Sequence, residues 1–304
     1  MNVLLTGING FIGRNLAYHL LRQGYDVIGI DISKNCIVND ISEYYSGTIL
    51  DNTLISKAIK NVDVIIHLAA MTSHTDIINN KFKTLEINLK GTQNILEAFN
   101  YSERAHKFIY SSTGKVYGEI KQVPITEECP TKPLNILGKS KLITEQLIDF
   151  YSDCDKDFII FRIFQIYGPN QQKNFLIPTI LSQVNNICKK KVKIVLGDIK
   201  AKRDYVYVDD VINAFIKAIK VKNKTNLNIF NICTGQPSSA EEIVEVIAKK
   251  LDINVDININ NKLFRHDEMD VEFGSYNKVQ NLLSWSPQFT LEEGLINTIE
   301  NTLK

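Results

Sequence analysis

The 304-residue sequence has little of several features that would place it in a specialised class. Its five cysteines are scattered without paired spacing, so neither a disulfide framework nor a zinc site is indicated. Its 35 Lys and Arg residues nearly balance its 34 Asp and Glu residues, and no net field favours nucleic acid or an anionic membrane. No apolar run approaches the ~18 residues of a membrane span, and the apolar start is too short for a signal peptide. We therefore expect a cytoplasmic protein without metal, nucleic-acid partner or membrane attachment.

Three glycines near the N-terminus give the first positive signal. Gly7, Gly10 and Gly13 follow a short apolar strand at three-residue spacing and open an amphipathic segment that runs to about Gln23. Glycine permits a tight turn and a close approach of the backbone to phosphate, while the amides at the start of the helix face the anion. The second strand ends in Asp31, where a carboxylate can bind ribose hydroxyls. This pattern predicts a site for a dinucleotide.

The first half of the chain alternates apolar strands with helical patterns. We expect strands at 3–5, 27–30, 62–68, 108–111 and 158–163, with helices at 88–100 and 138–151. This alternation predicts an α/β fold with a doubly wound parallel sheet of Rossmann type, whose ligands bind at the carboxyl ends of the strands.

A change of pattern after Asn170 predicts a smaller C-terminal α/β lobe. It should contain helices at 177–189 and 239–251 and strands at 192–196 and 252–260. We place the Rossmann domain at 1–170 and about 205–235, and a nucleotide-sugar-binding lobe at about 171–204 and 236–304.

The chain resembles the extended short-chain dehydrogenase/reductase family, in its branch of nucleotide-sugar epimerases, dehydratases and 4-keto reductases. The resemblance covers nearly the whole length, and its motifs occur in the order of the family. Besides the glycine motif and Asp31, it rests on His67-Leu-Ala-Ala70, Asn88-Leu-Lys-Gly-Thr92, Tyr110-Ser-Ser-Thr113, Val116-Tyr-Gly118, Gly138-Lys-Ser-Lys141 with Glu145, Tyr167-Gly-Pro169 and Arg203-Asp-Tyr-Val-Tyr-Val-Asp-Asp210.

The resemblance implies a bound NAD and a set of residues that hold it. The implied cofactor-binding residues are Gly7, Asn9, Gly10, Phe11, Ile12, Gly13, Asp31, Leu68, Ala69, Ala70 and Lys141. Asp31 favours NAD because a carboxylate would repel the 2′-phosphate of NADP. Lys34 could offset that repulsion, so NADP stays an alternative.

The resemblance also implies where chemistry occurs. Ser111, Ser112 and Thr113 correspond to hydroxyls that hydrogen-bond the reacting sugar oxygen, although they could simply satisfy the end of a strand. Lys141 corresponds to a lysine that binds the nicotinamide ribose and lowers the pKa of an acid/base partner.

Three further residues are implied substrate-binding residues: Gln165, Arg203 and Arg265. A guanidinium fork suits a diphosphate, but either arginine could instead form a surface ion pair.

Other motif residues have structural interpretations. His67 is expected to be a core residue, and Asn88 to support the geometry of the site. We interpret Asp204, Asp209 and Asp210 as helix-capping carboxylates rather than metal ligands.

The chain departs from the family pattern at the position of the acid/base tyrosine. That tyrosine lies four residues before the lysine, where this chain has Leu137, and an aliphatic side chain cannot carry a proton. Gly114 and Lys115 stand where 4,6-dehydratases have an Asp-Glu pair, which argues against dehydration.

Two hypotheses follow. The first is an NAD(P)-dependent nucleotide-sugar 4-keto reductase or 4-epimerase in the synthesis of surface-polysaccharide sugars. The second is a weakly active or inactive protein that binds NAD and a nucleotide sugar. Either is expected to form a homodimer through a four-helix bundle built from helices near 88–100 and 138–151.

Overall fold

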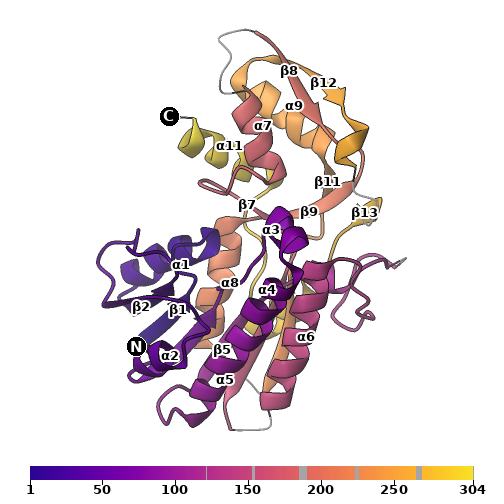
Figure 1. Cartoon of the computed structure of the whole chain (residues 1–304). Helices are drawn as coiled ribbons and strands as arrows, with labels where there is room; N and C mark the ends of the chain where they lie inside the picture. The colour runs from indigo at the N-terminus through magenta and orange to yellow at the C-terminus, as the bar shows by residue number, and fades with distance from the viewer. Residues whose placement is uncertain (121, 153–154, 185–189, 223–225, 265–268, 304) are drawn as a thin grey trace.

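A computed structural model describes residues 1–120, 122–152, 155–184, 190–222, 226–264 and 269–303 of the chain. Its larger part is built on a seven-stranded sheet in the order β10-β6-β5-β4-β1-β2-β3, with all neighbours parallel (Figure 1). The strands are β1 (Asn2–Thr6), β2 (Asp26–Asp31), β3 (Glu43–Ser46), β4 (Val64–His67), β5 (Lys107–Thr113), β6 (Asp157–Ile163) and β10 (Leu227–Ile232). This order is that of the doubly wound fold, which the alternation of strands and helices predicted.

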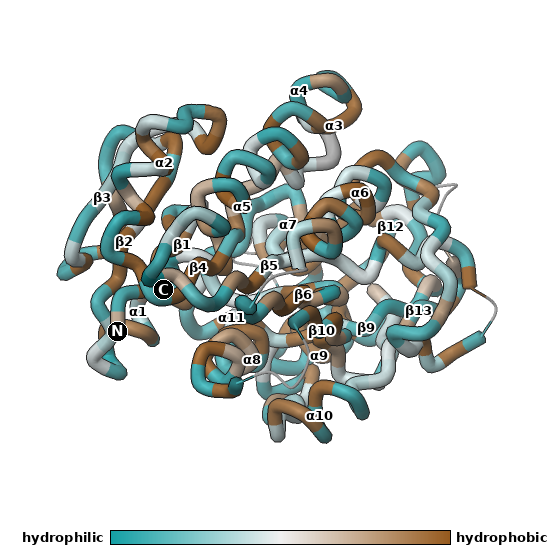
Figure 2. Tube along the Cα trace, turned by 90° about the horizontal axis from the view of Figure 1, so that it is seen from below, coloured by the Kyte–Doolittle hydropathy of each residue, from teal (hydrophilic) through white to brown (hydrophobic). Residues whose placement is uncertain are grey.

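Helices cover both faces of this sheet. They are α1 (Phe11–Arg22), α2 (Asn52–Ile59), α3 (His74–Asn79), α4 (Lys81–Leu85), α5 (Gly91–Tyr101), α6 (Ile136–Tyr151) and α8 (Val208–Lys220). In Figure 2, α5 and α8 alternate between hydrophobic and hydrophilic residues, as expected for helices with one buried face.

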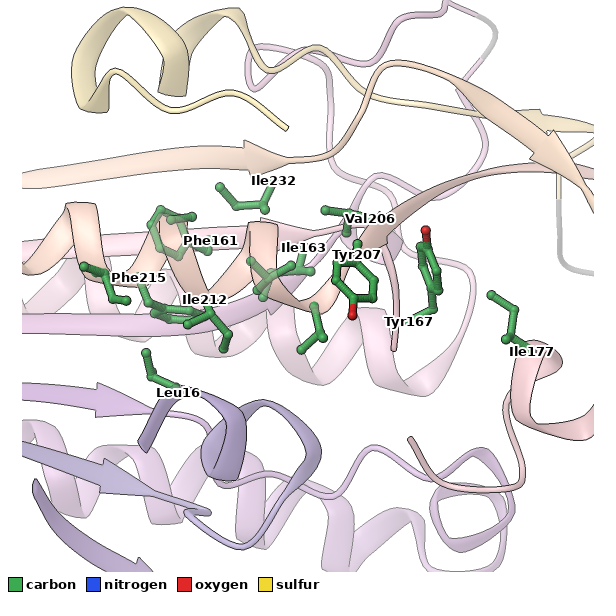
Figure 3. Close-up of a cluster of buried hydrophobic side chains, with 14 of the residues drawn as sticks. Leu16, Phe161, Ile163, Tyr167, Ile177, Val206, Tyr207, Ile212, Phe215 and Ile232 are labelled. Carbon is green, nitrogen blue, oxygen red and sulfur yellow. The ribbon is translucent and has the colours of Figure 1, made fainter. Parts of the chain in front are cut away.

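The side chains of successive strand residues pack into two different hydrophobic cores, because side chains alternate between the two faces of a sheet. Val3 and Leu5 of β1 lie in a core with residues of α1 and α8, whereas Leu4 lies in a core with residues of α2, α5 and α6. Figure 3 shows the first core, in which the rings of Phe161 and Phe215 meet edge to face at 5.1 Å. Burial on both faces explains why these strands read as continuous apolar runs.

The smaller C-terminal part contains two further sheets. Strand β9 (Lys202–Tyr207) pairs with β7 (Gln165–Tyr167), β11 (Pro237–Ser239) and β13 (Val271–Glu272), while β8 (Lys191–Leu196) pairs with β12 (Asn254–Ile259). The remaining helices are α7 (Leu176–Val184), α9 (Ala240–Leu251), α10 (Asn277–Leu283) and α11 (Leu291–Thr302). Capping boxes start α9 at Ser239 and α11 at Thr290.

Most expected elements are present, with small differences at their ends. The strand expected at 62–68 is limited to Val64–His67. Of the helix expected at 177–189, α7 covers the part up to Val184, and 185–189 lie outside the described residues. β10 joins the larger sheet and β8 and β12 form a separate one. The domain boundaries given above stay a proposal.

Within the described part of the chain, none of the helices combines the length and the apolar character that a membrane crossing requires.

Candidate active site

The glycine motif forms the turn between β1 and α1. Gly7 has a φ of +69°, and a Cβ on it would lie 3.0 Å from backbone atoms of Ala69. A Cβ on Gly13 would lie 2.2 Å from the carbonyl oxygen of Gly7, and one on Gly10 would lie 3.0 Å from that same oxygen. A side chain is therefore excluded at Gly13, strained at Gly7 and crowded at Gly10, and the turn stays open to a ligand that contacts its backbone.

The first turn of α1 presents its backbone amides to that turn. Gly10 is the N-cap residue, and neither a side-chain cap nor an acidic residue in the first turn satisfies the helix start. The amides of Phe11, Ile12 and Gly13 have no carbonyl partner within the helix, because none precedes them at the required spacing. This 12-residue helix therefore offers donors and a positive dipole end to an anion such as a pyrophosphate.

Asp31 lies at the carboxyl end of the neighbouring strand, β2. Its two carboxylate oxygens accept hydrogen bonds from the backbone amides of Asn9, at 3.1 Å, and Ser33, at 3.0 Å. The side chain of Asn9 accepts from the amide of Ile37 at 2.9 Å, so it shapes the loop after Asp31. The glycine turn, the helix start and this carboxylate fit the pyrophosphate and the adenosine ribose of a dinucleotide.

His67 is a fully buried link between the glycine turn and the next helix. Thr6 Oγ1 accepts from the amides of Leu68 and Ala69, so its own hydrogen goes to His67 Nδ1 at 2.6 Å. Thr92 Oγ1 donates to the carbonyl of Asn88, so it accepts from His67 Nε2 at 2.9 Å. The His67 ring is thus neutral, with its proton on Nε2. Burial, reinforced by the charge of Lys141, lowers the pKa of His67 to about 3.

Asn88 lies in a π-helical turn, Glu86–Lys90, that precedes α5. Its side chain bonds both backbone groups of Met71 and donates to Ser140 Oγ at 3.1 Å, and its carbonyl accepts from Thr144 of α6. Asn88 therefore connects the segment after β4 with α6, which agrees with its expected supporting role. Nothing in the sequence reading indicated the π-turn.

The three hydroxyl residues end β5 and do not share one environment. Ser112 is buried and donates its hydroxyl hydrogen to Glu145 Oε1. The half-buried Thr113 accepts from the amide of Lys115 at 3.2 Å, which leaves its hydroxyl hydrogen free for another acceptor. Ser111 is also half-buried, and its carbonyl oxygen accepts from Lys141. Alternation along the strand turns Ser112 away from the face of Ser111 and Thr113.

Lys141 brings α6 to the end of β5. Its side chain is only 4% exposed, its Nζ donates to the Ser111 carbonyl at 2.6 Å, and it lies 4.5 Å from the centre of the Tyr110 ring. Burial lowers the pKa of Lys141 to about 7, although the charge of Glu145 opposes this shift. Leu137 lies one helical turn before Lys141 and is half-buried.

A buried ionic network supports this end of the sheet. Arg162 of β6 pairs with Glu145 of α6 at 2.7 Å and donates to the Tyr117 hydroxyl at 3.0 Å, while Tyr117 donates to Asn231 at 2.7 Å. Burial raises the pKa of Tyr117. The sequence analysis did not single out Arg162; a lone charge inside the apolar run at 158–163 was the available signal.

The candidate substrate-binding residues lie in and beside the smaller sheets. Gln165 is half-buried in β7, which pairs with β9 next to Tyr205. Arg203 is buried in β9, with its Nε 3.7 Å from Glu272 Oε2, and Lys115 contacts the same carboxylate oxygen at 2.7 Å. Arg265 lies outside the described residues.

Two of the three aspartates, Asp204 and Asp210, connect loops through their side chains, and Asp209 lies in the first turn of α8. Asp204 accepts from the amides of Thr234, Gly235 and Gly274, and Asp210 accepts from the amides of Gln288 and Phe289. The N-cap residue of α8 is Tyr207, without a side-chain cap bond, so our capping interpretation was wrong in detail. Across the described ranges, no cluster of three or more His, Cys, Asp or Glu residues could hold a metal ion.

A comparison with known families decides the membership of the chain. Residues 4–298 match the family described as GDP-mannose 4,6 dehydratase. The chain belongs to this family. The match confirms the predicted membership of the extended short-chain dehydrogenase/reductases that act on nucleotide sugars.

Relatives of this dehydratase-family chain include several kinds of enzyme. It is 32% identical to a putative UDP-glucose 4-epimerase of Methanocaldococcus jannaschii, over 99% of this chain and 98% of the relative. It is 28% identical to a GDP-6-deoxy-D-mannose reductase of Pseudomonas aeruginosa, over 77% of this chain and 78% of the relative.

Solved structures of similar proteins share the whole fold. The UDP-glucose 4-epimerase of Thermotoga maritima, solved with UDP-glucose, is 27% identical and superposes with a TM-score of 0.90, over 99% of this chain and 98% of that one. A second structure, MoeE5 in complex with UDP-glucuronic acid and NAD, is 25% identical with a TM-score of 0.88 over 99% and 98% of the two chains.

Proposed function

We propose that this protein is an NAD(P)-dependent oxidoreductase that acts at C4 of a nucleotide-activated sugar. The reaction is either reduction of a 4-keto group or 4-epimerisation through a 4-keto intermediate. The observation that carries this proposal is that the glycine turn, Asp31 and Thr113 lie at the carboxyl ends of strands of one parallel sheet, where Lys141 of α6 bonds to the end of β5. Ligands of such sheets bind at this edge.

The cofactor would be held by the residues that fit it. The glycine turn and the first turn of α1 would hold the pyrophosphate, Asp31 the adenosine ribose, and Leu68, Ala69 and Ala70 the adjoining wall. Lys141 would contact the nicotinamide ribose. Bound nicotinamide supplies or accepts the hydride. We propose NAD over NADP because the Asp31 carboxylate would repel a 2′-phosphate.

Thr113 and Ser112 receive different roles in this proposal. Thr113 can donate its hydroxyl hydrogen to the reacting sugar oxygen, since its hydrogen bond with the Lys115 amide uses the oxygen as an acceptor. Ser112 acts as a positioning residue through Glu145, because its hydroxyl hydrogen is already donated there. Ser111 contributes its carbonyl oxygen to Lys141.

We do not propose dehydration, despite the name of the family. Elimination of water needs an acid and a base beside the sugar. At the positions of the Asp-Glu pair of the dehydratases this chain has Gly114 and Lys115, and the lysine is paired with Glu272. A lysine in an ion pair with a carboxylate does not supply both groups.

Arg203, Arg265 and Gln165 are proposed to bind the nucleotide diphosphate and the sugar. Arg203 belongs to a cluster with Glu272 and Lys115, so a substrate phosphate would have to compete with the Glu272 carboxylate. Guanidinium is suited to that exchange because it can form two parallel bonds to phosphate.

One observation favours a second function, that of a binding protein without turnover. Leu137 replaces the tyrosine that the family pattern places one helical turn before Lys141. General acid catalysis is typically worth about 100- to 10,000-fold in rate, so its loss would leave a protein that binds more than it converts.

We also propose a homodimer that buries an apolar stripe on α3, α4, α5 and α6. Phe82 is 83% exposed and Phe150 is 79% exposed, and Ile78, Leu85, Tyr101 and Ile143 are exposed on the same group of helices. Figure 2 shows hydrophobic residues at the projecting end formed by α3 and α4. A patch of this kind marks an interface rather than an ordinary surface.

Product analysis tests the proposed function. The purified protein is incubated with UDP-, dTDP-, GDP- and CDP-sugars, including 4-keto-6-deoxy forms, with NADH or NADPH, and the products are identified by mass spectrometry. A reduced or epimerised sugar supports the enzyme. Bound cofactor with no conversion of any sugar supports the binding protein.

A further inference from the structure

Resting on the proposed function, we propose that Lys141 itself exchanges the proton with the reacting sugar oxygen. In this role it is a catalytic acid and base, and not only the residue that binds the ribose.

Lys141 lies where a proton donor is needed. Its ammonium group is buried at the carboxyl end of β5, where it contacts the carbonyl of Ser111 two residues before Thr113. Leu137, one turn earlier on the same helix, offers no proton at the adjoining position. Of Leu137 and Lys141, only Lys141 can carry a proton.

The other protic groups around this strand end either donate to other partners or, as for Tyr110, are buried with a pKa that burial raises. Ser112 donates to Glu145, and Tyr117 is buried and donates to Asn231. Tyr110 is 1% exposed, and its ring lies beneath the Lys141 ammonium. Thr113 can pass on a proton through its hydroxyl, but it needs a titratable neighbour to replace that proton.

The groups that face Lys141 leave its pKa in a range that suits acid and base catalysis. Glu145 of α6 shares its charge with Arg162 of β6. His67 of β4 is neutral, and Tyr110 of β5 has a pKa that is raised by burial. Burial dominates this balance and lowers the pKa of Lys141 to about 7. A group with a pKa near the working pH is the most effective general acid and base.

The proton step balances in both directions. In reduction, the sugar carbonyl carbon gains the hydride that the nicotinamide supplies, and the π electron pair of the C=O bond moves to oxygen. That oxygen takes a proton as one N–H bond of the Lys141 ammonium breaks, and the resulting amine regains a proton from solvent. In oxidation, the neutral amine of Lys141 accepts the proton of the sugar hydroxyl as the hydride leaves the carbon.

Lys141→Arg is the most informative variant. Arginine keeps a cation and several donors but does not deprotonate in proteins, so it can bind ribose without acting as an acid. We expect NAD binding to change less than tenfold, measured by titration calorimetry, while kcat falls about 100-fold or more. Lys141→Met, which removes the charge as well, should lose cofactor affinity in addition.

A second substitution separates lost chemistry from lost structure. In Leu137→Tyr/Lys141→Arg the phenol supplies the proton beside a cation, so kcat should recover at least tenfold over Lys141→Arg. Leu137→Phe/Lys141→Arg is the matched control, with the same ring and no hydroxyl, and it should show no recovery.

Direct titration gives a readout that does not need substrate. With lysine labelled by ¹³C at Cε, one resonance that is missing from Lys141→Arg should titrate near neutral pH. An active Lys141→Arg enzyme, or a Lys141 resonance that titrates like an exposed lysine while product still forms, would overturn this inference alone. If neither the wild type nor Leu137→Tyr converts any nucleotide sugar, the proposed function fails and this inference fails with it.

Discussion

Glu145 and Arg162 form a buried ion pair at 2.7 Å that joins α6 to β6 directly beneath the end of β5. The same carboxylate accepts from Ser112, and the same guanidinium donates to Tyr117. The end of β5 is thus supported by a network whose members all lie in the interior.

Breaking this pair should be costly for stability. Removal of one partner leaves an uncompensated buried charge, which typically costs about 3 to 5 kcal/mol. Glu145→Leu and Arg162→Met should each lower the free energy of unfolding by about that amount in urea titrations. The double variant Glu145→Leu/Arg162→Met should lose clearly less than the sum, and strict additivity would contradict the pairing.

Leu137→Tyr should raise activity. A phenol beside the Lys141 charge is a better acid/base than the arrangement present, and such groups are worth about 100- to 10,000-fold. We expect at least a tenfold rise in kcat in steady-state assays. Leu137→Phe controls for the ring and should not rise; an equal gain from both variants would mean that packing, not proton transfer, had limited the rate.

His67 should make stability fall in acid. Its folded pKa of about 3 lies below the unfolded value of 6.5, so below pH 6.5 the unfolded state binds more protons. This contribution is complete above pH 6.5 and is lost as pH falls toward 3, at up to about 1.4 kcal/mol per pH unit. Burial raises the pKa of Asp210 to about 6, so its contribution to stability increases as the pH falls below 6, opposite to that of His67.

The comparison with His67→Gln isolates the histidine from Asp210. Urea unfolding between pH 7 and pH 4 should show a shallower loss of stability for the variant than for the wild type. Parallel curves would show that His67 is not held neutral.

Gly13→Ala should damage both stability and cofactor binding. The new Cβ would lie 2.2 Å from the Gly7 carbonyl oxygen and 2.8 Å from Ile8 Cα, and backbone atoms cannot move aside cheaply. We expect a lower melting temperature and weaker NAD binding by calorimetry. Gly24→Asn is the control, because nothing lies within 4 Å of its Cβ position and asparagine tolerates the positive φ. A tolerated Gly13→Ala would contradict the tight turn.

Charge on the apolar stripe should dissociate the proposed dimer. Phe82→Glu and Phe150→Glu each place a carboxylate where two copies would meet, so sedimentation should show monomers. Tyr18→Glu alters an exposed aromatic residue on α1, on the other face of the sheet, and should leave the oligomeric state unchanged. A monomeric wild type would refute the dimer.

The sequence predicted the strands, helices and glycine turn well because their patterns lie within a few neighbouring residues. Strand and helix periods, the three glycines and Asp31 each reflect backbone geometry within a few residues, and these elements are where they were expected. The separation of Ser112 from Thr113 was less visible, since it depends on which strand face meets Glu145.

Long-range partners explain the remaining differences. Glu272 lies over 150 positions from Lys115 in the sequence, and no local sequence pattern could predict their contact. Asp204 and Asp210 satisfy amides in distant loops, so an interpretation based on the neighbouring helix start placed them incorrectly.

Hydride transfer at the sugar C4 is the central claim, and isotope tracing tests it most directly. Nucleotide hexoses deuterated at C4 are incubated with the protein and NAD, and the sugars and cofactor are examined by mass spectrometry and NMR. We predict that deuterium is found in reduced cofactor or retained at C4 of an epimer. If neither the wild type nor Leu137→Tyr yields deuterated reduced cofactor or a deuterated C4 epimer, with cofactor and sugar bound, the account is contradicted.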